Sequence, residues 1–228
     1  MKILCIGDSL GLPREEVQYE DTWFFKVKSM YPFIEWIDYF QRGLLVNEAV
    51  QKFDTYYSFY HPDIVIWQSG ICDCSPRYIN DMKIFWRLLI KVTKKLKVES
   101  LFWKLIKKLF KRNPKTVYTP INDFEQQMIN LIEKFFLNGA ELVIIIKIGK
   151  ASNIVLQNSP HINNNISKYN EVYDRIHQRY PQKVVVLDPL NKGDDALYVD
   201  GYHCNKIGMN KVLNSISSCL CQILHFQS

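Results

Sequence analysis

Short runs of consecutive apolar residues alternate with longer amphipathic stretches along the chain. Apolar runs of this kind, bounded by turn residues, are typical of strands in a sheet that is covered on both faces. The pattern predicts five such strands, at residues 2–6, 33–39, 62–68, 142–146 and 183–187.

The longer stretches repeat their apolar residues at three- and four-residue spacing, which predicts helices. The helix expected over residues 45–60 would place Ala49, Phe53, Tyr56, Tyr57 and Tyr60 on one face. Further helices are predicted at residues 21–30, 120–138, 166–180 and 205–226. Thr119 followed by Pro120 is interpreted as an N-cap with proline at the first helical position.

Strand and helix alternate five times, with one insertion at about residues 82–115. That order predicts an α/β fold with a doubly wound, mostly parallel five-stranded sheet, in which ligands bind at the carboxyl ends of the strands. A chain of 228 residues favours one domain over two. The asparagine run at residues 163–165 is interpreted as a polar loop.

Charge is distributed unevenly between the insertion and the rest of the chain. Lys and Arg total 29 against 23 acidic residues, a net charge of +6. Residues 83–115 hold twelve basic residues and one acid, Glu99, and therefore carry +11, whereas the remaining 17 basic and 22 acidic residues give −5. A basic segment on a mildly acidic body indicates an anionic partner, either nucleic acid or a membrane surface.

The basic segment itself is predicted to form two helices, at residues 82–98 and 101–112, with Ser100 as a cap for the second. Apolar residues of the second helix share one face, and lysines fill the other; the apolar set is Phe102, Leu105, Ile106, Leu109 and Phe110. This arrangement is typical of a helix that lies on an anionic membrane. A helical cap or oligomer surface stays open as an alternative, while nucleic acid is not expected because the aromatic residues lie away from the cations.

The start of the chain lacks an apolar stretch followed by a cleavage site, so no secretory signal is expected. No apolar run approaches the roughly 20 residues that a bilayer-spanning helix needs. A cytoplasmic protein is therefore expected, with any contact to the inner membrane face being peripheral. In that setting the six cysteines are expected to be free thiols, with Cys219 and Cys221 buried in the last helix.

A zinc site is an alternative role for some of the cysteines. Cys72 and Cys74 could supply one pair of ligands, and His203 with Cys204 the other. These spacings are not those of the usual zinc sites. Neither a metal nor another cofactor is expected.

Two strand ends carry residues suited to nucleophilic chemistry. The first strand ends in Gly7-Asp8-Ser9-Leu10, which places a serine hydroxyl at the edge of the sheet. Serine needs a base to remove its proton. Asp200 lies three residues before His203, ahead of the last helix, and can hold the imidazole in the tautomer that leaves its other nitrogen free for a hydroxyl.

In these residues the sequence resembles the SGNH/GDSL hydrolase superfamily over nearly its whole length. Gly7-Asp8-Ser9-Leu10 matches the first block of that superfamily, Gly43 the second, Gly70-Ile71-Cys72-Asp73 the third, and Asp200 with His203 the last. The resemblance implies an SGNH or flavodoxin-like three-layer sandwich, with Ser9, His203 and Asp200 as catalytic residues. It also implies an oxyanion hole made by Ser9, Gly43 and the residue at position 72.

One position departs from the superfamily pattern. The third block usually carries an asparagine whose side chain completes the oxyanion hole, and here Cys72 replaces it. A thiol is only a weak hydrogen-bond donor, and losing one oxyanion donor costs about two to three powers of ten in rate. Either the amides of Ser9 and Gly43 suffice, or another donor replaces the asparagine, or the protein is a slow or degenerate member.

Two further residues near the third block are candidates for substrate binding. Asp73 completes that block, and Arg77 follows it as a planar, permanently charged donor suited to a carboxylate or phosphate. The continuation from Gly70 to Arg77 resembles a variant block of SGNH-type proteins associated with bacterial surface-polysaccharide loci. That resemblance favours a specialised branch over decay.

These observations predict a serine esterase, or an enzyme that transfers O-acyl groups, through a Ser-His-Asp triad. The expected substrate is an acylated carbohydrate or a lipid-linked glycan at the membrane surface. The alternative is a non-catalytic SGNH-fold module that binds a glycan or a protein. Esterase and transferase share the acyl-enzyme half-reaction, so the residues leave that choice open.

Overall fold

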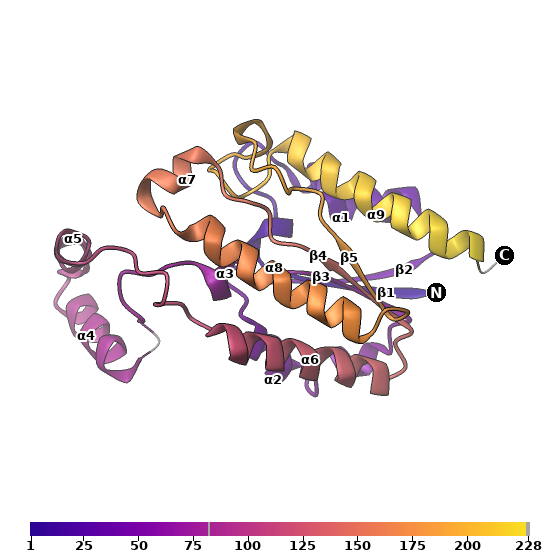
Figure 1. Cartoon of the computed structure of the whole chain (residues 1–228), viewed down its shortest axis with the longest axis horizontal. Helices are drawn as coiled ribbons and strands as arrows, with labels where there is room; N and C mark the ends of the chain where they lie inside the picture. Colours follow the sequence, from indigo (N-terminus) through magenta and orange to yellow (C-terminus); the bar gives the residue numbers. More distant parts are fainter. Residues whose placement is uncertain (82, 227–228) are drawn as a thin grey trace.

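The computed structural model describes residues 1–81 and 83–226, and it has a five-stranded sheet at its centre (Figure 1). The strands are β1 (Lys2–Gly7), β2 (Glu35–Phe40), β3 (Ile64–Gln68), β4 (Leu142–Ile146) and β5 (Val184–Leu187). Their order in the sheet is β2-β1-β3-β4-β5, and every neighbouring pair is parallel. The chain winds outward from β1 in both directions, so the predicted doubly wound α/β class is confirmed.

Helices cover both faces of the sheet, as the all-apolar strands predicted. Helices α2 (Val46–Lys52), α6 (Ile121–Leu137) and α8 (Ile162–Arg179) pack on one face, and α1 (Trp23–Met30) and α9 (Lys206–Phe226) on the other (Figure 1). Side chains alternate between the two cores along each strand: Leu4 and Ile6 face the first set, and Ile3 and Cys5 face the second. The burial of both faces of β1, β3 and β4 explains why their sequences lack polar alternation.

The helix expected over residues 45–60 is shorter than predicted. Helix α2 ends at Lys52, and a separate 3₁₀ turn covers Tyr57–Tyr60. Phe53 and Tyr57 both pack against Phe135, with ring centroids 5.0 and 6.0 Å apart, and the chain turns between them to allow this. Tyr56 is consequently half exposed instead of sharing one buried helical face.

Two predicted helix caps are wrong. Pro120, not Thr119, is the N-cap of α6, and Val98, not Ser100, is the N-cap of α5 (Glu99–Leu109). The hydroxyl of Thr119 donates instead to the carboxylate of Asp73, which lies on α3 (Ile71–Cys74). A hydrogen bond to a buried carboxylate is stronger than one to a backbone amide, which accounts for the choice.

The asparagine run interpreted as a polar loop lies inside α8, which begins at Ile162. Asn163 donates to the carbonyl of Ala151 (2.9 Å) and accepts from its amide (2.8 Å). Asn165 is buried and donates to the carbonyls of Cys74 (2.8 Å) and Pro114 (3.0 Å). These polar side chains satisfy loop backbone groups at the carboxyl end of the sheet, so they stabilise the loops and the helix together.

The basic insertion forms two helices, α4 (Ile84–Lys95) and α5, beyond the carboxyl ends of the strands and apart from the helical layers (Figure 1). We call residues 83–115 the basic arm. The predicted first helix also included Met82, which lies outside the described residues. Within the described chain, no helix combines the length and the hydropathy needed to cross a bilayer.

The six cysteine sulfurs are all free. Cys219 is buried, as predicted, but Cys221 is exposed, which corrects the expectation for that residue. The Cys221 sulfur lies 3.2 Å from the hydroxyl of Tyr31 on the outer side of α9. Two residues apart on a helix, the two thiols point in different directions, so only one reaches the core.

Candidate active site

Ser9 opens a short 3₁₀ turn directly after β1. The carboxylate of Asp8 caps this turn by accepting from the amide of Leu10 (2.9 Å), and the Asp8 amide donates to the carbonyl of Gln68 at the end of β3 (3.1 Å). A Cβ on Gly7 would lie 2.6 Å from the ring of Phe40, too close for any side chain. The close approach of β2 therefore requires glycine before the serine, and the turn presents the Ser9 hydroxyl at the edge of the sheet.

His203 reaches the same edge from the loop that precedes α9. Its Nε2 lies 2.9 Å from Ser9 Oγ, and its Nδ1 lies 2.8 Å from Asp200 Oδ2. Asp200 Oδ1 also accepts from the His203 amide (3.0 Å), so the aspartate fixes both the ring and its backbone. Gly201 between them has a φ of +99°, a conformation that favours glycine. The structure thus brings Ser9 together with Asp200 and His203, although Ser9 and His203 lie 194 positions apart in the sequence.

The Asp200 carboxylate is ionised at neutral pH. Its partial burial raises its pKa, but the hydrogen bonds from the His203 side chain and backbone outweigh burial and lower the pKa to about 2. An ionised Asp200 accepts a hydrogen bond from the protonated Nδ1 of His203. This tautomer leaves Nε2 as the acceptor for the Ser9 hydroxyl. This is the arrangement in which a histidine can act as a general base.

Arg14 is a site residue that sequence reasoning missed. Its Nη1 lies 3.1 Å from Asp200 Oδ2 and 2.7 Å from His203 Nε2, and it also contacts Nδ1 of that ring. A tight backbone pairing between Arg14 and Val17 turns the chain back toward the site. Its only sequence signal is its place five residues after Ser9, because the contact forms through folding of the loop and not through a recognisable spacing.

A cavity of about 300 Å³ opens beside the Ser9 hydroxyl, and His203 and Asp200 line it too. Ile71 and Cys72 of α3 form one side. Val155 of α7 (Asn153–Asn158), a helix that the sequence did not predict, lines the other. The cavity lies at the carboxyl ends of the strands, where the doubly wound fold was expected to bind ligands.

The predicted oxyanion-hole residues are placed differently from one another. Cys72 lines the cavity, and burial, followed by the negative charge of Asp8, raises the pKa of its thiol to about 12. It is therefore a neutral, weak donor at neutral pH. Gly43 lies in an exposed left-handed turn after β2, with a φ of +75°, and is not among the residues that line the cavity. The role of its amide stays a prediction.

Asp73, which the sequence predicts to bind substrate, is placed behind the cavity wall, so that role stays a prediction. Its side chain is fully buried, accepts from the amide of Val46 (3.2 Å) and from the hydroxyl of Thr119, and does not line the cavity. Burial is the main cause that raises its pKa to about 7. Asp73 ties α3 to the starts of α2 and α6, so it positions the cavity wall. Arg77, the other predicted substrate-binding residue, does line the cavity.

The zinc alternative gains no ligand set from the structure. Among the described residues, no group of three or more His, Cys, Asp and Glu side chains is arranged to hold a metal ion. Cys74 and Cys204 are both buried, and the Cys74 thiol points to the carbonyl of Ile71 (3.6 Å).

Comparison with known proteins gives matches among solved structures only. No family model matches the chain, and no curated protein matches it. A lipase/acylhydrolase from Enterococcus faecalis matches with a TM-score of 0.64 and 16% identity, over 94% of this chain and 92% of the other. A member of the lipolytic G-D-S-L family from Veillonella parvula matches with a TM-score of 0.61 and 12% identity, over 95% and 96%. The chain has the SGNH/GDSL hydrolase fold.

An acetylxylan esterase from Geobacillus stearothermophilus, solved as a catalytic mutant, has the same fold, with a TM-score of 0.63 and 14% identity over 94% of this chain and 91% of that one. The SGNH/GDSL fold predicted from four sequence blocks is therefore confirmed. At this level of identity the likeness is one of fold, and the chemistry of the site rests on its own residues.

Proposed function

We propose that the protein is a serine esterase that cleaves O-acyl esters through Ser9, His203 and Asp200. The observation that carries this proposal is the continuous hydrogen-bonded series from Ser9 Oγ to His203 Nε2 (2.9 Å) and from His203 Nδ1 to Asp200 Oδ2 (2.8 Å) beside an open cavity. A serine that only capped a turn would need neither the imidazole nor the carboxylate behind it.

In the proposed reaction, His203 Nε2 takes the Ser9 proton as Oγ attacks the acyl carbonyl carbon. The carbonyl π electrons move to oxygen, and the resulting oxyanion accepts from the Ser9 amide and from the Cys72 thiol. As the C–O bond to the alcohol breaks, His203 returns the proton to the leaving oxygen, which leaves the acyl group on Ser9. A water molecule then repeats the sequence and releases the acid.

The proposed substrate class is an acylated carbohydrate or a lipid-linked glycan. Support comes from the SGNH/GDSL fold, which acetylxylan esterases among its neighbours share, and from a cavity of about 300 Å³ that accommodates a small acyl chain beside polar groups. An acceptor hydroxyl in place of water would make the same acyl-enzyme a transferase.

Hydrolysis of p-nitrophenyl acetate by the purified protein tests the proposed function. Ser9→Ala should reduce kcat by about four powers of ten, because removal of the nucleophile leaves only binding and oxyanion stabilisation. Ser29→Ala, at an exposed serine on α1, is the matched control and should retain wild-type activity. Equal rates for wild type and Ser9→Ala would favour the binding-module alternative instead.

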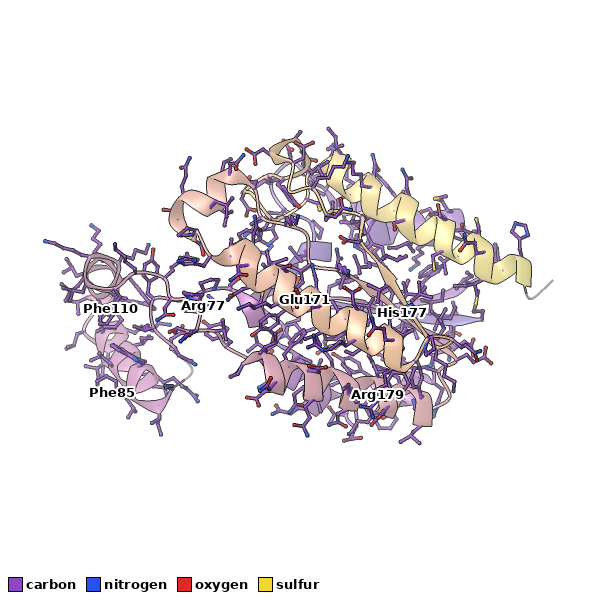
Figure 2. All side chains as sticks on the ribbon, viewed as in Figure 1. Arg77, Phe85, Phe110, Glu171, His177 and Arg179 are labelled. Atoms are coloured by element: carbon purple, nitrogen blue, oxygen red, sulfur yellow. The ribbon has the colours of Figure 1, made fainter. Side chains whose placement is uncertain are left out.

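We also propose that the basic arm contacts an anionic membrane surface. Its helices bury little: Thr93 is the only buried residue of α4 and Ile106 the only one of α5. Apolar side chains along both helices are exposed instead, among them Ile84 (78%), Leu88 (57%), Leu105 (53%) and Leu109 (65%). Figure 2 shows Phe85 and Phe110 on this arm, away from the sheet.

Charge complementarity favours an anionic lipid surface over a second protein for this apolar face. The arm carries twelve basic residues against Glu99, and Glu99 pairs with Lys94 (3.7 Å). Each lysine or arginine near an anionic leaflet contributes about 1 kcal/mol, and exposed apolar side chains add burial in the interface. The predicted helical cap does not account for so many exposed apolar side chains, because a cap would bury them against the body.

Sedimentation with phosphatidylglycerol-containing vesicles tests the membrane contact. The double variant Leu88→Gln/Leu105→Gln should lose at least about tenfold in partition coefficient, since each change removes an apolar side chain from the interface. Leu137→Gln is the matched control, because Leu137 is 89% exposed but lies on α6 in the body. The proposal is contradicted if the double variant and the control bind the vesicles equally well.

A further inference from the structure

Two arginines line the cavity together with Ser9: Arg77, which follows α3, and Arg112, which follows α5 in the basic arm. They come from separate parts of the chain that a backbone pairing joins. The Arg77 carbonyl accepts from the amide of Asn113 (3.0 Å), next to Arg112. Figure 2 shows Arg77 at the junction of the arm with the body. The arm therefore supplies a cation to the same cavity that holds the serine.

Both guanidinium groups lie against tyrosine rings. Arg77 Cζ is 4.0 Å from the ring centroid of Tyr118, and Arg112 Cζ is 5.2 Å from that of Tyr78. Such cation–π contacts restrain a guanidinium while its edge nitrogens stay available to a ligand. The arginines are therefore oriented before any ligand arrives.

Among the described residues, neither arginine finds a full set of hydrogen-bond acceptors. Both Nε atoms are buried without a partner there, and the one side-chain hydrogen bond of the pair is a long contact of Arg77 Nη2 with the carbonyl of Cys72 (3.4 Å). Among the described residues, Arg14, Arg175 and Arg179 each have a carboxylate within 4.0 Å, but Arg77 and Arg112 have none. Asp81 lines a small adjoining cavity with both arginines without forming such a pair.

Unpaired, half-buried arginines with fixed orientation are costly unless a ligand supplies the missing charge. The carboxylate of Asp200 also lines the cavity, but it is engaged by His203 and Arg14. An anionic group in the cavity would accept from the edges of both guanidiniums, as phosphate and carboxylate groups do in proteins.

We propose that Arg77 and Arg112 form an anion subsite, so that the substrate is an ester of an alcohol that itself bears a phosphate or a carboxylate. This inference rests on the proposed esterase function for the position of the ester, while the anion subsite binds its ligand whether or not turnover occurs. Bidentate contact with two guanidiniums places the charged group on the arm side of the cavity and the acyl group over Ser9. A phosphorylated or uronic acid sugar carrying an O-acetyl group has this chemistry.

The test compares acetate release from three esters that differ in one group: an acetylated hexose, the same hexose carrying a phosphate, and an acetylated hexuronic acid. Wild type should prefer a charged ester over the neutral one by at least about tenfold in kcat/KM. Arg112→Ala and Arg77→Ala should each reduce that preference by about tenfold. Arg87→Ala is the matched control, because Arg87 is exposed on α4 and lies outside the cavity.

Comparison of the phosphate and carboxylate esters identifies the group that the subsite selects. Thermal unfolding of each variant shows whether it folds, and Arg77→Lys keeps the charge without the planar fork, so it should recover only part of the preference. Equal preference in wild type and both alanine variants, with normal unfolding, overturns the proposal.

Binding by catalytically inactive protein separates this proposal from the esterase function. Calorimetry with Ser9→Ala should detect the hexose phosphate or the hexuronic acid, but not the neutral hexose at the same concentration, and added Arg112→Ala should abolish the difference. Charged-ligand binding without turnover in wild type would leave the subsite standing and remove the esterase. Turnover without any preference for a charged ester would support the esterase function and contradict the anion subsite.

Discussion

Helices α6 and α5 have similar apolar patterns but bury their side chains very differently. In α6, five apolar side chains are buried: Phe124, Met128, Leu131, Ile132 and Phe135. In α5 only Ile106 is buried, while Leu101, Leu105 and Leu109 are exposed. The two helices belong to regions of opposite charge, since the basic arm carries +11 and the rest of the chain −5.

Periodicity therefore identifies an apolar face but not what covers it. The apolar face of α6 packs on a sheet and on neighbouring helices, whereas most apolar side chains of α5 are exposed despite the same spacing. Hydrophobic burial therefore explains the stability of the body, whereas the helices of the basic arm leave most of their apolar side chains exposed. The two regions meet at the cavity, where Ser9 comes from the body and Arg112 from the arm.

The largest expected effect is on turnover, and it should be confined to the body. His203→Ala removes the base that lies 2.9 Å from Ser9 Oγ, so kcat for a p-nitrophenyl ester should fall by at least about three powers of ten. Lys91→Ala on α4 is the matched change in the arm and should leave this rate within twofold, as a stopped assay would record. A comparable loss of kcat in both variants would mean that turnover depends on the arm as well as on the body.

A pair of leucine truncations tests the difference in burial directly. Leu131→Ala, at a side chain 1% exposed on α6, should lower the free energy of unfolding by about 2–5 kcal/mol. Leu105→Ala, at a side chain 53% exposed on α5, should change it by less than about 0.5 kcal/mol. Urea unfolding followed by circular dichroism measures both, and a large loss for Leu105→Ala would indicate that the arm is packed as a cap.

Restoring the amide at position 72 tests how the body stabilises the oxyanion. Cys72→Asn replaces a thiol whose pKa is raised to about 12, a weak donor, by an amide that donates well. We expect kcat to rise by about tenfold or more, whereas Cys221→Asn on the exposed side of α9 should leave it unchanged. A fall in kcat for Cys72→Asn would show that the cavity requires the smaller side chain.

The smallest effect concerns the pH dependence of stability. Asp73 has a pKa of about 7 in the fold against 3.8 as an ordinary carboxyl. Between these values the folded protein holds a proton that the unfolded chain has lost, so the free energy of unfolding falls as pH rises from about 4 to about 7. Asp73→Asn removes this contribution and should stabilise the protein at pH 8 by about 1–2 kcal/mol.

Thermal unfolding of wild type and Asp73→Asn at pH 5 and pH 8 measures this difference. The dependence of stability on pH should be weaker in Asp73→Asn than in wild type. It should not vanish, because burial also raises the pKa of Asp8 to about 7. Asp54→Asn, at an exposed carboxylate that pairs with Lys134, is the control and should leave the slope unchanged. A variant that is less stable at both pH values would show that the carboxylate contributes more through its hydrogen bonds than it costs through burial.

Much of the fold and the centre of the site followed from the sequence, for a physical reason. Strands buried on both faces leave a continuous apolar run, and the predicted strand at residues 142–146 matches β4 throughout. The Gly7 to Leu10 turn and the Asp200–His203 spacing each involve residues that are close in sequence, so their geometry can be predicted from the sequence. Ser9 was placed at the sheet edge because a strand must end before a turn can begin.

The remaining site residues depend on contacts between distant segments, which no spacing encodes. Arg14 contacts His203 across 189 positions. Arg112 lies inside the predicted helix at residues 101–112, whereas in the structure α5 ends before it, at Leu109. Asp73 carried the signature of a site residue, but its neighbours Val46 and Thr119 enclose it. Asn165 appeared to lie in a polar loop because its hydrogen-bond partners, the carbonyls of Cys74 and Pro114, are remote in sequence.

The covalent adduct that the protein forms with a fluorophosphonate shows most directly whether Ser9 is the nucleophile. The hydrogen-bonded series from Asp200 through His203 to Ser9 predicts one phosphonyl group per chain, found on the peptide that contains Ser9 after proteolysis and mass spectrometry. The same treatment of His203→Ala should give almost none, because the base is missing. An unmodified Ser9 in wild type, or an adduct on another residue with Ser9 free, would contradict the account.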